Sequence, residues 1–447
     1  MFECLKQKLI KLSKKQHRYS KNLKLFSISI FLFFKSTHYK ILRQLLPLPS
    51  VSSVKNYIKN LETEEGISKL LIKMLKTKIS LIKYSDVCFL LLDKINLKTG
   101  INYNRKYDKV TDILAGSNKK TNNALCIMAR GIISKWKQPI GYYFSSGPMN
   151  YLKIREILEK AIVSMENEGF NVTGYTTDQG ANFEKLSRVM GATPSHPYVT
   201  FQNKDYFVFK DPPHLIKNSR TFLLNNNIIV SSKLPKPAEW KHLQAYYEKS
   251  RRSGSLVYAP KLTHKHLYNL KFQNKMKVKL ATQVISNSCS VALEMCVVNQ
   301  ELDSGALSTS IYCKKMNDIF DILNSSSIKA KVPLRKPISI GSKSYKEIEK
   351  MKSWLQELDK LNKGHKVKFI KGFIQSLNVV IQLLDKLHKH NIKYLSTRNL
   401  CQDPLENFFG RIRSLNKSPD SKQLEENFRR VAFTDLLSPV LKQLTMT

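Results

Sequence analysis

The sequence predicts a mixed α/β protein with a helical N-terminal region and a long, mainly helical part. Short apolar runs rich in β-branched and aromatic residues lie between residues 86 and 210, the pattern of buried strands. From Trp240 to about Leu323 the pattern is helical, with few strand signals. The 447 residues therefore divide into 1–80, helical and basic; 81–224, rich in strands; 225–390, helical; and 391–447, a closing helix and tail.

The charge balance predicts a polyanionic partner. The chain has 75 Lys and Arg residues against 34 Asp and Glu residues, a formal net charge of +41. Such an excess favours nucleic acid, because each neutralised phosphate releases condensed counterions. Lys, Asn, Ile and Tyr are abundant together, which is also the signature of an AT-rich genome, and we assign a smaller share of the excess to that cause.

The cysteines and the apolar runs favour a reducing intracellular compartment and no membrane. The seven cysteines are scattered and never spaced as Cys-x-x-Cys, so they predict neither a disulfide framework nor a zinc site. The one strongly apolar run, Leu25 to Phe34, is too short to span a bilayer and lies between Lys24 and Lys35. We interpret it as a buried helix.

In the N-terminal region two helices are predicted on either side of a proline-rich break. The break contains Pro47 and Pro49, and nearby serines are suited to cap the second helix, at 54–60. The pair fits a helix-turn-helix that lies on DNA, or a packing or dimerisation subdomain. Packing is slightly favoured, since no recognition-helix residues stand out.

The strand-rich part is predicted as a mixed sheet with flanking helices. A helix is expected from Tyr151 to Glu168. Strands are expected at 87–92, 124–133, 139–144, 172–176 and 205–210. The first run ends on Asp93, and a carboxylate that closes an apolar strand must reach solvent, a cation or a metal ion. A salt bridge to Lys94 or Lys98 would also satisfy it.

A second acid, Asp178, is predicted at a later strand end. The apolar lead-in from Phe170 ends on this residue, Gln-Gly breaks the pattern, and a helix begins near Asn182. Strand ends often hold catalytic or binding groups, because the strand fixes the side chain while the loop leaves it accessible. An Asp shortly before a Gly is also a common turn residue, so both interpretations stand here.

The strand at 205–210 leads into Asp211-Pro-Pro-His214, which has the form of a helix start with Asp211 as its cap. His214 and Lys217 are then expected to face outward, where they suit phosphate contact or plain solvation. Further on, residues 325–344 are rich in Ser, Pro, Gly and Lys and are predicted to be a mobile link. Helices are expected at 345–361 and 370–390.

Near the end, Asp403-Pro-Leu-Glu406 begins another predicted helix. The spacing has the form of a capping box with Asp403 as the cap. Alternatively, Glu406 points from the first helical turn towards other carboxylates. Arg411 and Arg413 on the same helix fit phosphate contacts better than a core.

Taken together, these motifs resemble the transposases of the P element group and their relatives that carry THAP domains. Six spaced phrases carry the resemblance, in the family's order: Phe34 to Arg43 with Leu46-Pro-Leu-Pro-Ser50, Gly131 to Gly141, Asp178 to Asn182, Asp211 to Asn218, Ala259-Pro-Lys-Leu-Thr263 and Asp403 to Gly410. The resemblance implies an RNase H-like catalytic domain that is interrupted by a helical, GTP-binding insertion.

It further implies an acidic triad of Asp93, Asp178 and Glu406, with Asp403 as a fourth carboxylate, that holds Mg²⁺ or Mn²⁺ for DNA cleavage and strand transfer. Such chemistry uses two divalent ions that activate the attacking oxygen and stabilise the leaving one. The implied guanine site is formed by Phe320, Asp321 and Asn324, with Lys261, Val278 and Ser286 also lining the nucleotide. No Gly-x-x-x-x-Gly-Lys loop is present, so this is not a phosphate-cradling hydrolase site of the usual kind. The resemblance implies that GTP binds and helps to hold DNA, with no hydrolysis required.

The implied partners are the DNA of transposon ends and of the target, contacted through His214, Lys217, Arg411 and Arg413. We further expect a homodimer or higher oligomer and nuclear localisation. The sequence departs from the family in three ways: no Cys-Cys-Cys-His zinc module precedes the domain, Lys94-Ile95 follows Asp93 where the family has Glu-Met, and the tail after Leu437 is short. These departures lead us to expect a truncated or domesticated core. The alternatives are a DNA- and GTP-binding remnant without catalysis, and a nuclease acting on RNA–DNA hybrids.

Overall fold

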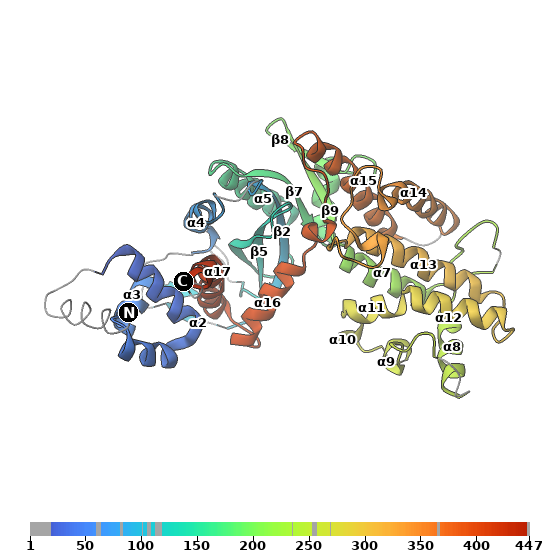
Figure 1. Cartoon of the computed structure of the whole chain (residues 1–447), viewed down its shortest axis with the longest axis horizontal. Coiled ribbons are helices and arrows are strands. Elements are labelled where there is room, and N and C mark those ends of the chain that lie inside the picture. Colours follow the sequence, from blue (N-terminus) through green and yellow to red (C-terminus); the bar gives the residue numbers. More distant parts are fainter. Residues whose placement is uncertain are drawn as a thin grey trace.

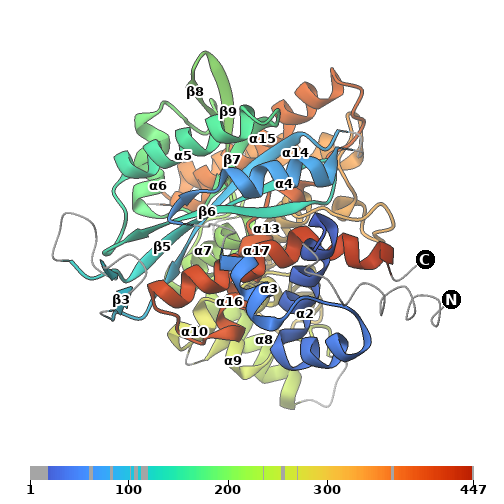
Figure 2. The same ribbon diagram turned by 90° about the vertical axis from the view of Figure 1, so that its left-hand side faces the viewer.

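The structure is a computed structural model. It describes residues 19–59, 64–80, 84–100, 102–104, 109–111, 119–234, 236–252, 257–268, 270–363 and 367–444. Figure 1 shows three regions side by side: the N-terminal helices, a central sheet with its covering helices, and a helical lobe. Figure 2 looks along the molecule, with α5 and α6 on one side of the sheet and α16 and α17 on the other.

The centre of the fold is a seven-stranded mixed sheet in the order β1-β6-β5-β2-β7-β9-β8. Strands β6, β5 and β2 run antiparallel, whereas β2, β7 and β9 run parallel. The strands are β1 (Gly66–Ile67), β2 (Val87–Asn96), β5 (Asn123–Gly131), β6 (Lys137–Ser145), β7 (Asn171–Thr177), β8 (Tyr198–Phe201) and β9 (Lys204–Lys210). The predicted mixed sheet is confirmed. The short strands β1 and β8, and a separate pair β3 (Asn102–Asn104) and β4 (Lys109–Thr111), were not predicted.

Helices bury both faces of this sheet. On one face lie α4 (Lys69–Ile79), α5 (Tyr151–Glu166) and α6 (Ala181–Val189). The other is covered by α7 (Pro212–Asn225), α15 (Lys368–His388), α16 (Asp403–Leu415) and α17 (Ser421–Leu444). Because both faces are covered, the central strand β2 is apolar from Val87 to Leu92 and fully buried there.

The N-terminal region is a helical pair, α2 (Lys21–Leu45) and α3 (Val51–Lys59). The predicted break between the two helices is present, and the Tyr39 hydroxyl donates to the carbonyl of Pro49 across it at 2.9 Å. Ser50 caps α3 by accepting from the backbone N–H of Ser53 at 3.0 Å. Since α2 packs against α17, this pair forms a packing surface with the end of the chain.

The helical lobe follows α7. It contains α8 (Trp240–Arg252), α9 (His264–Leu267), α10 (Phe272–Lys275), α11 (Val278–Val284), α12 (Asn287–Val298), α13 (Ala306–Leu323), the 3₁₀ turn η1 (Pro333–Arg335) and α14 (Lys343–Leu361). By length and hydropathy, Val278–Val298 is the one described stretch that qualifies as a membrane span. It is divided into two helices at Ile285 and Ser286.

Two features of this lobe differ from the expectation. The predicted link at 325–344 is held at both ends, because Ser325 and Ser344 are buried and the Ser325 N–H donates to the Thr397 hydroxyl at 2.9 Å, while most residues between them are exposed. Polar residues can be buried here because their hydrogen bonds are satisfied. We assigned the segment of helix α15 to the helical part at 225–390. This helix packs on β9 of the sheet, where the Gln375 amide donates to the carbonyl of Val208 at 2.9 Å. It therefore covers the sheet.

Candidate active site and nucleotide pocket

Asp93 on β2 and Asp178, the residue just after β7, lie beside each other, because these two strands are neighbours and parallel. The register pairs Leu91 of β2 with Thr176 of β7, and two residues further along both strands lie the two acids. The prediction that Asp93 ends its strand is wrong, because β5 pairs with β2 as far as Asn96. The predicted strand end at Asp178 is present, since β7 ends at Thr177. The Asp93 carboxylate accepts from the Lys94 N–H at 2.7 Å, and that of Asp178 from the Gly180 N–H at 2.9 Å.

Glu406 is brought to the same place by the segment that leads into α16. The Gln402 side chain donates to the carbonyl of Leu92, next to Asp93 in β2. The hydroxyl of Thr176, on β7, donates to the carbonyl of Leu400 at 2.6 Å. Glu406 then stands in the first turn of α16, with its side chain 40% exposed. The capping box is not formed, because the helix begins at Asp403 and no side chain caps it.

Asp211 and His214 complete this group. Asp211 caps α7 as predicted, accepting from the His214 N–H, and its buried carboxylate also lies 2.7 Å from His214 Nδ1. The other ring nitrogen of His214, Nε2, lies 3.9 Å from Glu406 Oε1. The expectation that His214 and Lys217 face outward is wrong: Lys217 is 8% exposed, and both face the acids because α7 begins where β9 ends beside them.

The electrostatics show that these groups share one locality. Burial raises the pKa of Asp93 to about 7; the charge of His214 opposes this, while Asp178 and Glu406 add to it. Burial also raises the pKa of Glu406, with His214 again opposing. Burial alone would lower the pKa of His214, but the hydrogen bond to Asp211 and its charge raise it overall. Such crowding of acids favours a bound cation.

The acids suit a magnesium site chemically, since Mg²⁺ prefers carboxylate oxygens. As the side chains lie, no group of three or more His, Cys, Asp or Glu residues among the described residues is close enough to hold a metal ion. The side chain of Glu406 is partly exposed. Asp403, expected as a fourth carboxylate, instead pairs with Arg398 at 3.0 Å.

Lysine and arginine side chains that were expected to pair with Asp93 or to contact DNA have different surroundings in the structure. Among the described residues, neither Lys94 nor Lys98 forms an ion pair with Asp93. Lys94 is exposed and, by strand alternation, leaves β2 on the other face from Asp93. Of the two arginines of α16, Arg411 pairs with Asp435 of α17, whereas Arg413 is exposed, 6.0 Å above the Phe409 ring.

In the helical lobe a pocket of about 580 Å³ lies where the nucleotide was expected, within the size range of ligand sites. Five of the six predicted residues line it: Lys261, Ser286, Phe320, Asp321 and Asn324. Val278 does not line it, because this first residue of α11 packs against the hydrophobic core. Sequence reasoning missed Asn317, Arg335 and Arg398, which also line the pocket.

The polar atoms of this pocket fit a guanine base. Burial raises the pKa of Asp321, and Arg335, 2.9 Å away, opposes the shift. The buried Oδ1 of Asn324 has no hydrogen-bond partner among the described residues. A carboxylate and an unpaired amide oxygen offer acceptors to the N–H groups of guanine's Watson–Crick edge.

Comparison with known proteins agrees with this arrangement. Residues 63–191 match the family model "TNP-like, RNase H N-terminal domain", and residues 213–337 match "TNP-like, GTP-binding insertion domain". The chain is 26% identical over 381 residues to the Transposable element P transposase of Drosophila melanogaster, covering 82% of this chain and 47% of that protein. This chain is a P element-type transposase relative. It is also 24% identical over 330 residues to DNA transposase THAP9 of Homo sapiens, covering 69% of this chain and 35% of that protein.

A solved structure supports the fold of this transposase relative. The Drosophila P element transposase strand transfer complex matches with a TM-score of 0.82 and 22% identity, over 96% of this chain and 95% of that one. The RNase H-like domain with its helical, GTP-binding-type insertion is therefore confirmed as the fold. The chain spans about half the length of the first curated relative and about a third of the second.

Proposed function

We propose that this chain is the core of a DNA transposase that cleaves and joins DNA with a divalent metal ion, Mg²⁺ or Mn²⁺, and binds GTP as a cofactor. The observation that carries the proposal is that Asp93 on β2, Asp178 just after β7 and Glu406 on α16 lie together: burial raises the pKa of Asp93, and the charges of Asp178 and Glu406 add to the shift. Three carboxylates from β2, the end of β7 and α16 suit phosphoryl transfer.

In this proposal Asp93, Asp178 and Glu406 would hold the metal ions, which supply charge stabilisation for the attacking and leaving oxygens. The strands fix the two aspartates, and the bonds from Gln402 and Thr176 fix the approach of α16. His214, oriented by Asp211, offsets part of the negative charge beside Glu406.

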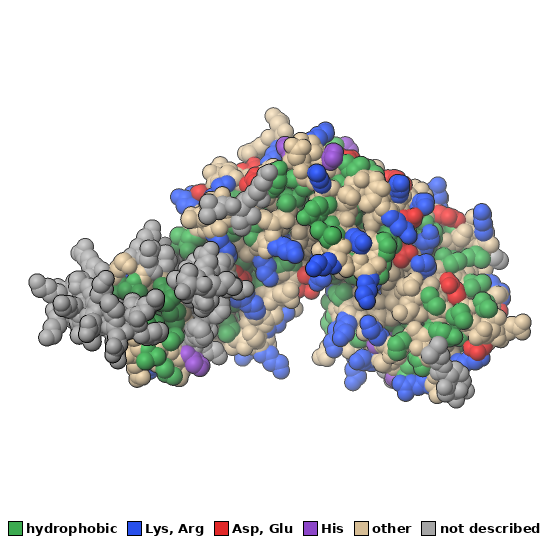
Figure 3. Space-filling view, viewed as in Figure 1, with side chains coloured by type: hydrophobic (Ala, Val, Ile, Leu, Met, Phe, Trp, Pro, Cys, Tyr) green, Lys and Arg blue, Asp and Glu red, His purple; other side chains and the backbone are tan. Residues whose placement is uncertain are grey.

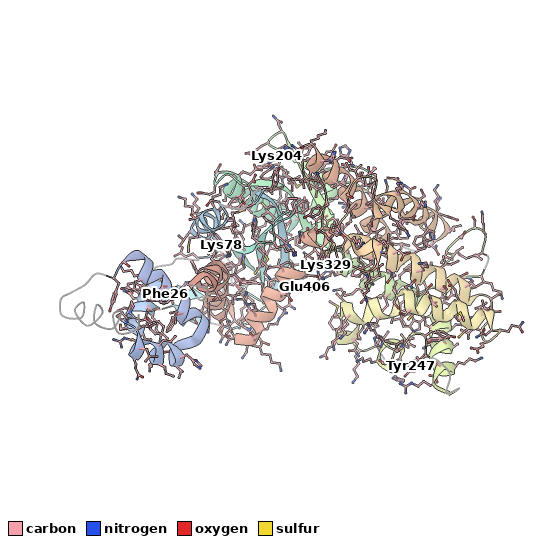
Figure 4. All side chains as sticks on the ribbon, in the orientation of Figure 1. Phe26, Lys78, Lys204, Tyr247, Lys329 and Glu406 are labelled. Carbon is pink, nitrogen blue, oxygen red and sulfur yellow. The ribbon has the colours of Figure 1, made fainter. Side chains whose placement is uncertain are left out.

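The path for DNA is suggested by the surface. Figure 3 shows the molecule hollowed between the sheet and the helical lobe, with Lys and Arg side chains on both sides of the hollow. Figure 4 places Glu406 at the inner end of this hollow, away from Phe26 in the N-terminal helices and Tyr247 in α8. A duplex held by such basic walls would bring a phosphodiester to the acids. The role further implies a nuclear location and an oligomer on DNA.

The alternative function is a DNA- and GTP-binding protein without catalysis. One observation favours it: the acids do not converge as a metal-holding group as their side chains lie. The two functions predict similar DNA binding and differ in chemistry.

The deciding experiment is a nicking assay on duplex DNA with Mg²⁺ or Mn²⁺, with and without GTP. We expect nicking by the wild-type chain and at least a hundredfold loss in Asp178→Asn, because the amide removes a charged metal ligand. Asp205→Asn is the matched control, because Asp205 is an exposed aspartate of the same sheet whose carboxylate accepts from the Thr200 hydroxyl at 2.7 Å. Absence of nicking under every metal condition would favour the non-catalytic alternative, and preference for an RNA–DNA hybrid would favour a nuclease.

A further inference from the structure

One arginine stands between the nucleotide pocket and the catalytic helix. Arg398 belongs to η2 (Thr397–Leu400) and lines the pocket. Its Nε and Nη2 atoms also donate to Asp403 Oδ2, at 3.2 and 3.0 Å. Asp403 is the first residue of α16, three residues before Glu406. The same arginine thus borders the pocket and pairs with a carboxylate beside the catalytic acids.

The backbone that carries Arg398 is firmly held on both sides. Towards the pocket, the Arg398 N–H donates to the carbonyl of Ser325 at 3.0 Å, and the Thr397 hydroxyl donates to the carbonyl of Ile322 at 2.7 Å. Towards the sheet, the Asn399 side chain donates to the carbonyl of Ile132 at 2.8 Å and accepts from Arg130 at 2.9 Å. Since the backbone of η2 is fixed, Arg398 can exchange one hydrogen-bond partner for another only by moving its side chain.

The two ion pairs at the pocket differ in the exposure of their carboxylates. Arg335 pairs with Asp321, and their side chains are 55% and 7% exposed. Arg398 pairs with Asp403, and their side chains are 50% and 26% exposed, so water screens the Asp403 carboxylate more than that of Asp321. Phosphate groups carry more charge than one carboxylate and bind guanidinium through two hydrogen bonds. A nucleotide's phosphates are therefore strong competitors for Arg398.

We infer that Asp403 and the phosphates of a guanine nucleotide compete for Arg398, which makes this residue a positioning link between the pocket and the catalytic helix. The inference rests on the proposed nucleotide site. Its consequence is that filling the pocket frees the Asp403 carboxylate, one turn before Glu406 on α16. Nucleotide binding would then change the charge beside the catalytic acids without moving the helices.

The test is GTP affinity by calorimetry on the full chain, in EDTA and without DNA, so that neither metal binding nor catalysis enters. Arg398→Gln should weaken GTP binding by about tenfold, because a charged hydrogen-bond donor is lost. Asp403→Asn should tighten it by about twofold to fivefold, since Arg398 is freed from a partly exposed pair. In the double variant the effect of Asp403→Asn should vanish. The affinity for guanosine, which has no phosphates, should be the same in both single variants as in the wild type.

Asp318→Asn is the control for charge alone. This acid lies on α13 near the pocket but pairs with Lys314 at 3.3 Å, so its effect should be the same with and without Arg398. The inference is overturned if Asp403→Asn leaves GTP affinity unchanged or weaker, or if its effect persists in the Arg398→Gln background. Absence of GTP binding by the wild type would overturn it together with the proposed nucleotide site, whereas the nicking assay tests the catalytic proposal separately.

Discussion

Burial raises the pKa of the Asp93 carboxyl on β2, and the charges of His214, Asp178 and Glu406 modify the shift. Its pKa lies at about 7, against an ordinary value of 3.8. Between these values the folded protein keeps a proton that the unfolded chain releases. The stability that Asp93 contributes is therefore fully present below about pH 4 and is lost as the pH rises to about 7.

Asp93→Asn should consequently stabilise the metal-free protein at neutral pH. Asparagine does not ionise, so the advantage of the variant should grow from pH 4 to pH 7 and then level off, at about 2–4 kcal/mol. The measurement is the difference in melting temperature between variant and wild type from pH 5 to pH 8 in EDTA, with Asp205→Asn as the exposed control. A difference that does not change with pH would contradict the raised pKa.

At the scale of elements, the sequence predicted a helix or strand correctly where all the residues that determine it lie in one segment. The strand at 205–210 and the cap of α7 at Asp211 were predicted because apolar runs and Asp-Pro-Pro are local features. That Glu406 approaches Asp93 and Asp178 in particular followed only from the family resemblance, since the bond from Gln402 to Leu92 joins residues 310 apart. The burial of Ser325 was missed for a similar reason: the hydroxyl that accepts from its N–H belongs to Thr397, 72 residues away.

Thr397 joins η2 to the end of α13, and its loss should loosen both. Its buried hydroxyl donates to the carbonyl of Ile322 and accepts from the Ser325 N–H. Thr397→Val keeps the shape but leaves these groups unpaired, which should cost about 1–3 kcal/mol of unfolding free energy. It should also weaken GTP binding, because Ser325 follows the pocket residue Asn324. Urea unfolding and calorimetry measure both effects, and Thr397→Ser, which retains the hydroxyl, should stay near wild type.

At the scale of the whole molecule, charge and shape point to the same partner. The net charge of +41 is spread over a molecule that is hollowed between its sheet and its helical lobe, with basic side chains along the hollow. The insertion separates α16 from the strands in sequence, yet α16 returns to β2 at the inner end of the hollow. An extended polyanion fits this arrangement better than a small anion does, since only a long partner can touch both walls.

The affinity of the chain for duplex DNA should therefore fall steeply with salt. If six to ten phosphates are contacted, raising the salt from about 50 to 200 mM should weaken binding by about 10³–10⁵-fold. Arg413, exposed on α16, should contribute to this slope, so that Arg413→Gln lowers it by about one unit on every DNA sequence. Arg411 lies two residues away but is paired with Asp435, so Arg411→Gln should reduce stability and leave the slope nearly unchanged. Fluorescence anisotropy across a salt series measures both slopes, and equal slopes for the two variants would exclude Arg413 as a phosphate contact.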